Sequence, residues 1–221
     1  MVIPEEMMNE ILNGFKSIHL SGIGKKFRDQ WIFRKVNLDI HSGEKIAITG
    51  QNGSGKSTFL QLLAGYISQS EGKISWQGNS AIIPVEDVHK YISFASPYLE
   101  LIEEFTLEEN LVFYSRYKKL QAGLTIPVII EKSGLAGATD KLIKNFSSGM
   151  KQRCKLAMAF MADTPVLLLD EPLSNLDSGG FEWYNNLVGS LAGNRTVIIC
   201  SNQVREETFF CDRVISIENF R

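Results

Sequence analysis

The pattern of apolar and polar residues predicts strands that alternate with helices. Val36, Leu38 and Ile40 alternate with polar neighbours, as in a half-buried strand, and residues 17–49 as a whole predict short strands joined by turns. Further strands are predicted at 45–49, 72–78, 166–169, 196–200 and 214–217. The fully apolar run at 166–169 is typical of a central strand in a parallel sheet, which is covered on both faces.

Helices are predicted between these strands from apolar spacings of three and four residues. Thr106 and Glu109 form a capping-box pattern that opens one of them. The predicted helical segments are 58–67, 106–120, 126–145 (one or two short helices), 150–161 and 179–192. Because the stretch from about 97 to 147 carries only helical signals, we expect an α/β domain with a parallel core and an inserted helical lobe there.

A glycine-rich segment between a predicted strand and a predicted helix fits the phosphate-binding pattern G-x-x-x-x-G-K-[ST]. It reads Gly50-Gln51-Asn52-Gly53-Ser54-Gly55-Lys56-Ser57-Thr58. Glycines let successive N–H groups turn toward a phosphate chain, and the helix N-terminus adds unpaired donors. We expect Lys56 to neutralise the β- and γ-phosphates, Ser57 Oγ to bind Mg²⁺ and Thr58 to donate to the α-phosphate. The segment therefore predicts a Mg-ATP site.

Two carboxylates end the apolar strand at 166–169. Asp170 lies where the end of a central strand can reach Mg²⁺ or its water shell. Glu171 follows it and is placed to accept a proton from an attacking water. By itself this pair is equally typical of a strand leaving the core, but together with the phosphate loop it predicts ATP hydrolysis.

A third motif stands upstream of the acidic strand, at Phe146-Ser147-Ser148-Gly149-Met150-Lys151-Gln152-Arg153, and a fourth, Ser174-Asn175-Leu176-Asp177, follows it. The third resembles the Leu-Ser-Gly-Gly-Gln signature of the ATP-binding cassette family, and the fourth is similar to that family's D-loop. The resemblance extends from about Ser17 to Ile217. It implies one nucleotide-binding domain over 1–221, with a P-loop NTPase core, a parallel sheet, an antiparallel β subdomain and the helical lobe.

The resemblance also implies a second subunit of this kind, in a homodimer or a heterodimer. In the family, the signature of one subunit faces the γ-phosphate held by the other, so Ser147 and Gly149 are expected to contact ATP bound to the partner. Ser147 and Ser148 are natural N-caps, which agrees with an anion site at a helix start. The family's adenine-stacking aromatic is expected at Phe27, with Trp31 as the competitor and a core aromatic as the alternative.

Two positions depart from the family pattern. The family's glutamine at the start of the helical lobe falls on Pro97, which has neither an amide side chain nor an N–H; Ser96 or a water is the alternative. The family's histidine after the following strand falls on Asn202, which can donate to the γ-phosphate but cannot shuttle a proton; Gln203 is a weaker alternative. We therefore expect a slow ATPase, and the rival hypothesis is a regulatory site that only binds nucleotide.

Composition narrows the class of protein. The 221 residues carry a net charge of −2, so no general nucleic-acid binder is indicated. Cys154, Cys200 and Cys211, an odd number without metal-type spacing, argue against a disulfide framework and favour a reducing cytosol, and Cys200, in an apolar run, is expected to be a buried structural thiol. His19, His41 and His89 match no catalytic role and are expected to be surface residues or residues with satisfied hydrogen bonds. No apolar run approaches a membrane span, and Glu5, Glu6 and Glu10 do not fit a signal peptide, so a membrane role needs a partner chain.

The leading hypothesis is the ATP-binding and ATP-hydrolysing subunit of a membrane transporter. Closure of the dimer on ATP would drive an integral membrane subunit on a separate chain, which places this subunit in the cytoplasm, peripheral on the inner face of the cell membrane. The signature resembles exporter-type ATPases, including the haem-exporter subunits of cytochrome c maturation. The alternative is a soluble cassette ATPase that serves no transporter, such as one in translation or cluster assembly.

Overall fold

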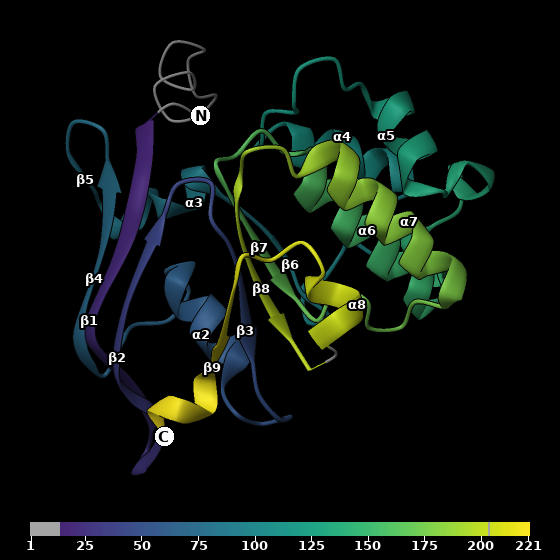
Figure 1. Ribbon diagram of the computed structural model, residues 1–221. Helices are drawn as coiled ribbons and strands as arrows, with labels where there is room; N and C mark the ends of the chain where they lie inside the picture. The colour runs from purple at the N-terminus through teal and green to yellow at the C-terminus, as the bar shows by residue number, and fades with distance from the viewer. Residues whose placement is uncertain (1–13, 203) are drawn as a thin grey trace. The chain divides into compact units, whose positions relative to one another are not determined.

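The computed structural model describes residues 14–202 and 204–221, which form two compact units (Figure 1). The core unit comprises residues 14–92, Thr164–Asp170 and Asn194–Arg221, and the helical unit comprises Ser93–Asp163 and Glu171–Gly193. Gln203, the weaker alternative to Asn202, and the N-terminal Glu5, Glu6 and Glu10 lie outside the described residues.

The core unit holds two sheets, and both predicted classes of strand are present. The antiparallel sheet has the order β2-β1-β4-β5, and the parallel sheet has the order β6-β7-β8-β3-β9, with β6 carrying the chain out of the unit. Their bounds are β1 Phe15–Phe27, β2 Gln30–His41, β3 Lys45–Thr49, β4 Glu71–Gly78, β5 Ile82–Ile83, β6 Ile92–Ala95, β7 Val166–Asp170, β8 Thr196–Ser201 and β9 Arg213–Ser216. This confirms the predicted α/β class and the parallel core.

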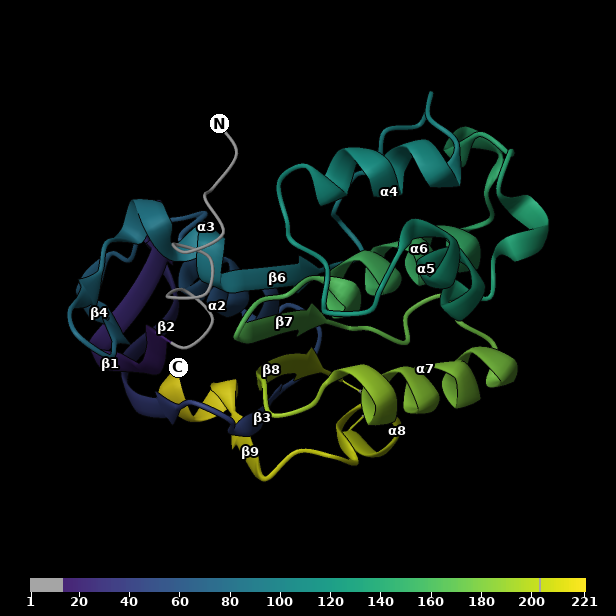
Figure 2. The ribbon, with the colours of Figure 1, turned by 90° about the horizontal axis from the view of Figure 1, so that it is seen from above.

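Helix α2 (Lys56–Leu63) lies between the two sheets of the core unit (Figures 1 and 2). Phe59 of α2 meets Phe33 of β2 with ring centroids 5.9 Å apart, and both side chains are buried. Every residue of β7 is buried, which agrees with the fully apolar run read from the sequence. Helix α2, which follows the phosphate loop, is thereby covered by one sheet on each side. The short α3 (Val88–Tyr91) and α8 (Val204–Thr208) complete the unit.

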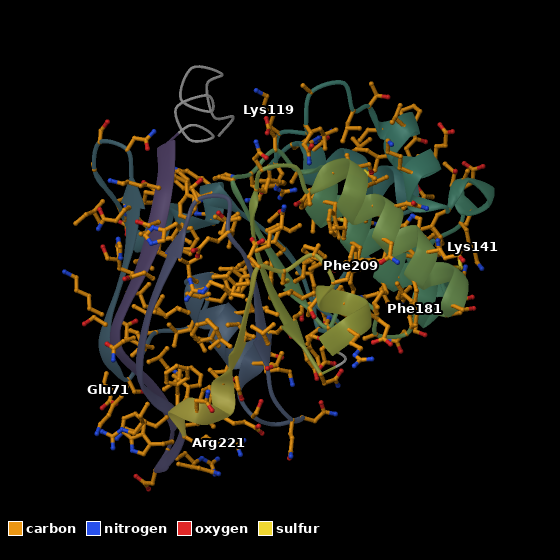
Figure 3. The ribbon with its side chains drawn as sticks, in the orientation of Figure 1. Glu71, Lys119, Lys141, Phe181, Phe209 and Arg221 are labelled. Atoms are coloured by element: carbon orange, nitrogen blue, oxygen red, sulfur yellow. The ribbon has the colours of Figure 1, made fainter. Side chains whose placement is uncertain are left out.

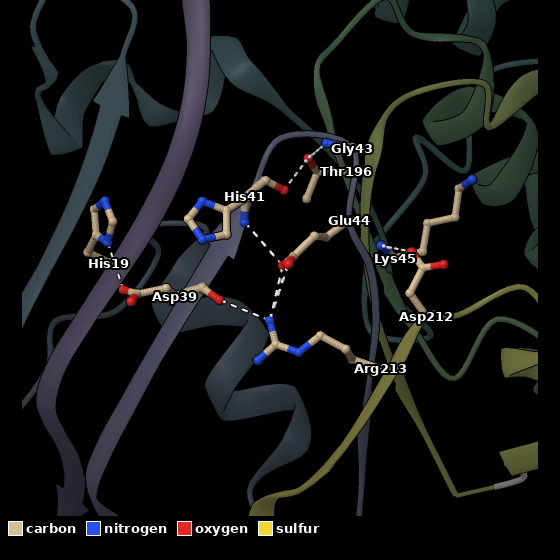
Figure 4. A network of polar contacts seen from close by, with 9 residues as sticks. All are labelled: His19, Asp39, His41, Gly43, Glu44, Lys45, Thr196, Asp212 and Arg213. Carbon is tan, nitrogen blue, oxygen red and sulfur yellow. Dashed lines mark hydrogen bonds and ion pairs between the residues drawn. The ribbon is translucent and has the colours of Figure 1, made fainter.

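Polar contacts tie the antiparallel sheet to the parallel one beside the turn that leads into β3. Arg213 Nη1 of β9 donates to Asp39 O and to Glu44 Oε2, each at 3.2 Å, and Figure 4 shows this network. The same Glu44 oxygen accepts from His41 N at 3.1 Å, while Thr196 Oγ1 donates to His41 O at 3.3 Å. These contacts hold the start of the phosphate-loop strand against both sheets.

The histidines and cysteines occupy structural positions. His19 Nδ1 lies 2.7 Å from Asp39 Oδ1, and His89 Nδ1 lies 2.6 Å from Glu86 O, as expected for satisfied residues. Cys200 is buried and donates to Lys56 O at 3.2 Å, which confirms a structural thiol. Burial raises the pKa of Cys154 to about 12, so this thiol is unreactive at neutral pH.

The helical unit is built from α4 (Leu107–Ser115), α5 (Ile126–Ser133), α6 (Ser148–Met161) and α7 (Ser178–Leu191). The predicted capping box at Thr106 and Glu109 is present at the start of α4. Phe160 of α6 packs on Tyr184 of α7 with ring centroids 6.2 Å apart, and both are buried. The helical unit therefore includes more residues than the lobe predicted at about 97–147, because α6 and α7 also contribute to its core.

Helix α4 ends earlier than the predicted residue 120. The chain turns after Ser115, and Leu120 forms an isolated bridge with Ala162. Gln121 N then donates to Met161 O at 2.9 Å. These bonds to the end of α6 replace the helical ones, so tertiary pairing overrides the local helical pattern. Strand β6 and helix α3 were not predicted, because residues 79–96 show no clear period in the sequence.

Candidate nucleotide-binding site

The phosphate loop joins β3 to α2 within the core unit, in the strand–loop–helix context that the motif requires. Gly50, Gly53 and Gly55 have φ angles of 152°, 77° and 103°, which side chains other than glycine rarely adopt. A Cβ on Gly55 would lie 2.4 Å from Ile32 Cγ2, and a Cβ on Gly50 would lie 2.6 Å from Ser54 Oγ. The glycines are thus needed for the loop itself to pack, as well as for access of a phosphate to its N–H groups.

Replacing Gly55 with alanine is expected to lower the free energy of unfolding by about 1–3 kcal/mol, because the new methyl group overpacks against Ile32. It is also expected to weaken ATP binding, since Gly55 is the N-cap of α2. Thermal unfolding and ATP titration measure the two effects. Gly189→Ala is the matched control: a Cβ there meets nothing within 4 Å and sits in helix α7. Equal melting temperatures for the two variants would contradict the prediction.

Lys56 and Ser54 give the loop its polar interior. Lys56 is buried, and its Nζ donates to Gly50 O at 2.8 Å and to Gln51 O at 3.1 Å. Ser54 Oγ is buried and has no hydrogen-bond partner among the described residues. Buried polar atoms are nearly always paired in proteins, so an unpaired hydroxyl inside a phosphate-binding loop fits a site made for an oxygen-rich ligand.

Ser57 and Asp170 lie together as the predicted metal pair. Ser57 Oγ donates to Asp170 Oδ1 at 3.1 Å, and Asp170 is buried at the end of β7. No group of three or more metal-ligating side chains of the His, Cys, Asp and Glu types occurs in the described part of the chain. Mg²⁺ usually takes one or two protein oxygens and completes its shell with phosphate oxygens and water, so these two residues fit it.

The two candidates for the adenine platform differ in what covers their rings. Phe27 is 49% exposed, at the end of β1, with Lys25 Nζ 4.9 Å from its ring centroid. The Trp31 ring is half-buried and already covered by the Arg34 guanidinium, 4.0 Å from its centroid. An open aromatic face favours Phe27 for stacking on a base, which stays a prediction.

Asn202 reaches the phosphate loop. Its Nδ2 donates to Asn52 Oδ1 at 3.0 Å, so the residue predicted to stand at the family's histidine position is linked to the loop through a side-chain amide pair. Glu218 and Arg221 also hold the loop, and neither was predicted from the sequence. Glu218 Oε1 accepts from Gln51 N at 3.3 Å, and Arg221 Nη2 (Figure 3) donates to Gly53 O at 3.2 Å. No sequence motif marks these two positions.

The signature residues belong to the helical unit, at the start of α6. Ser147 Oγ accepts from Met150 N at 3.2 Å, which confirms the predicted N-cap and leaves its own O–H free to donate. A Cβ on Gly149 would lie 2.9 Å from Asn175 O, and Asn175 has a left-handed φ of 65°. Glycine at position 149 is therefore required by the close approach of the D-loop backbone.

The remaining candidate residues of the helical unit lie beside two prolines. Glu171 has a left-handed φ of 44°, and the next carbonyl, Pro172 O, accepts from Gln152 Nε2 at 2.8 Å. Pro97 O accepts from Lys155 Nζ at 2.6 Å. Ser96, the alternative to Pro97, is buried, and its Oγ accepts from Tyr98 N at 3.3 Å. The assignment of Pro97 to the family's glutamine position stays a prediction, and the one polar group of this proline, its carbonyl, is held by a lysine.

Comparison with known proteins decides the family. The family model described as ABC transporter matches residues 33–174. The chain belongs to the ABC transporter family. The matched residues include the phosphate loop, the acidic strand and the segment 146–153.

Two relatives illustrate the similarity of this chain to other members of the family. The uncharacterized ABC transporter ATP-binding protein YdbJ of Bacillus subtilis (strain 168) is 29% identical over 203 residues, covering 91% of this chain and 66% of the relative. The Nod factor export ATP-binding protein I of Rhizobium sp. (strain N33) is 31% identical over 211 residues, covering 93% and 69%. The chain thus spans about two thirds of the length of these relatives.

A solved structure supports the ABC fold. A dimeric ATP-binding cassette in a post-hydrolysis state, bound to ADP and Pi, superimposes with a TM-score of 0.74 at 24% identity, covering 90% of this chain and 93% of that one. At this identity the likeness concerns the fold. Among residues 14–202 and 204–221, none of the helices combines the length and apolar character needed to cross a membrane.

Proposed function

We propose that the chain binds and hydrolyses Mg-ATP as the nucleotide-binding subunit of an exporter-type ABC transporter. The observation that carries the proposal is the complete phosphate loop with the Ser57–Asp170 pair beside it in the core unit. Relatives named for export support the exporter type. The transporter's membrane subunit would be a separate chain, which would place this subunit on the inner face of the cell membrane.

Each residue has a defined task in the proposed reaction. The N–H groups of the loop and Lys56 hold the phosphates, and Ser57 and Asp170 would hold Mg²⁺, whose charge when bound offsets the negative charge of the phosphate oxygens. A water oxygen attacks the γ-phosphorus, the bond from that phosphorus to the β,γ-bridging oxygen breaks, and ADP leaves. Glu171 accepts the proton that the water loses. Phe27 stacks on the adenine.

A second subunit completes the site. Ser147 and Gly149 lie at the N-terminus of α6, where unpaired N–H groups and a free hydroxyl proton suit an anion. They would contact the γ-phosphate held by the partner subunit, so ATP binding favours a closed dimer and loss of phosphate favours its opening. Pro97 and Asn202 lack the side chains that the family uses near the γ-phosphate, so we propose slow turnover.

The mass of the protein in solution tests the proposed dimer. A Glu171→Gln variant that keeps ATP intact is expected to double its mass on addition of Mg-ATP and to stay monomeric with Mg-ADP. Introducing Gly149→Ala into the same variant is expected to prevent the dimer while ATP still binds each monomer, because the new Cβ would crowd Asn175 O at 2.9 Å. A monomer at every ATP concentration in the Glu171→Gln variant would contradict the proposal for the isolated subunit.

A further inference from the structure

Residues 96–105, here called the connector, lead from β6 into α4 and are held by side chains of α6 in the helical unit. Lys155 Nζ donates to Pro97 O at 2.6 Å, and Lys151 Nζ pairs with Glu103 Oε1 at the same distance of 2.6 Å. These two lysines are four residues apart on α6, so they project from one face of the helix. The connector is thus attached to the signature helix near both of its ends.

Lys155 is an unusual side chain for this place. Only 8% of it is exposed, and burial lowers its pKa, while the nearby Glu100 opposes that change. A buried ammonium is unfavourable unless it is hydrogen-bonded, whereas an apolar side chain of similar length would pack there without that penalty. Because Pro97 lacks an N–H and a polar side chain, its carbonyl is the one group through which α6 can hold it. The pair is therefore a specific contact between the connector and α6.

The same turn of α6 holds a second proline carbonyl. Gln152 is buried, and its Nε2 donates to Pro172 O at 2.8 Å, directly after the candidate base Glu171. Gln152 and Lys155 are three residues apart and lie on adjacent positions of one helix face. One helical turn therefore anchors both the segment that carries the base and the segment at which the family's glutamine is replaced by Pro97.

We propose that Lys155 is a positioning residue that couples the connector to the Glu171 segment through α6. This contact compensates for the polar side chain that proline lacks at position 97. A displacement of the Glu171 segment is passed to α6 through Gln152, and from α6 to the connector through Lys155. The role in turnover rests on the proposed ATPase function, whereas the attachment of the connector does not.

Hydrogen exchange and kinetics of three variants test the proposal. Lys155→Met keeps the length and removes the charge and the donors, Lys155→Arg keeps both, and Lys141→Met removes an exposed lysine of the same unit (labelled in Figure 3) as the control. In Lys155→Met without nucleotide, the amides of Tyr98 and Ile102 are expected to exchange about tenfold faster, because local opening becomes easier. ATP hydrolysis is expected to fall about tenfold in kcat, with the Kd for ATP within about twofold, since mispositioning acts on the reacting geometry. Lys155→Arg is expected to restore both.

The outcomes separate the two proposals. Unchanged exchange in the connector of Lys155→Met would overturn the attachment. Two outcomes would mean that Lys155 only stabilises the fold and would overturn the coupling. In the first, faster exchange in Lys155→Met comes with a proportional loss of ATP binding. In the second, Lys155→Arg restores neither the exchange rate nor kcat. If the unaltered protein hydrolyses no ATP, the proposed function fails. The coupling is then decided by whether Mg-ATP slows connector exchange in the unaltered protein and leaves it unchanged in Lys155→Met; an equal response in both overturns it.

Discussion

Replacing Lys56 with methionine is expected to weaken ATP binding about a hundredfold or more, because a tenfold change corresponds to ~1.4 kcal/mol and each hydrogen bond to a charged group is worth ~1.5–3 kcal/mol. The Lys56 ammonium is buried inside the loop and donates to two loop carbonyls, at 2.8 and 3.1 Å. It is therefore already positioned for a phosphate, and its three donors can be shared between the loop and the ligand. Isothermal titration with Mg-ATP measures the effect.

Two features of the experiment make it specific. Lys73→Met removes an exposed lysine from β4 of the same core unit and is expected to bind ATP like the unaltered protein. Since Lys56 also ties Gly50 and Gln51 together, the melting temperature without nucleotide shows whether the loop itself has loosened. An affinity for ATP within a fewfold of the unaltered protein, at unchanged stability, would mean that the loop does not hold the phosphates.

The sequence predicted the parts of this site that are local in the chain. The strand–loop–helix order around 50–58 and the capping box at Thr106 and Glu109 depend on residues close together in the chain, and both are present. The helix predicted at 58–67 is shifted: α2 begins at Lys56 and ends at Leu63. The predicted end of the helix at residue 120 was wrong, because Leu120 pairs with Ala162. The spacing of apolar residues around Leu120 gives no sign of this distant partner. These two local predictions thus rest on short-range geometry.

Long-range contacts account for what the sequence did not predict. The hydrogen bonds of Glu218 and Arg221 to the phosphate loop join residues that are 167 and 168 positions apart in the chain. The Lys155–Pro97 bond spans 58 positions and depends on how α6 packs within its unit. Asn202 was placed near the nucleotide only through the family resemblance, and its bond to Asn52 gives that placement a physical basis in the core unit.

Replacing Glu171 with glutamine is expected to lower ATP turnover by about 10²–10⁴, the usual contribution of a general base, with little change in the affinity for ATP. Glutamine has nearly the same shape as glutamate but cannot accept the proton of the attacking water. The position has a left-handed φ of 44°, so the matched change preserves the side-chain size at a strained backbone site. Phosphate release under saturating Mg-ATP measures turnover. Glu182→Gln, on the exposed side of α7, is the control and is expected to keep full turnover.

The same measurement decides between the slow ATPase and the site that only binds nucleotide. For a slow ATPase, the unaltered protein turns over below about 1 s⁻¹, the lower end of typical enzymes, and Glu171→Gln lowers that rate by about 10²–10⁴. For a regulatory site, the unaltered protein releases no phosphate, and Glu171→Gln makes no difference. A fast unaltered enzyme would show that Pro97 and Asn202 do not limit the reaction. Because Asn202 is neutral but able to donate, and Lys155 holds the Pro97 carbonyl, we expect the slow and measurable rate rather than its absence.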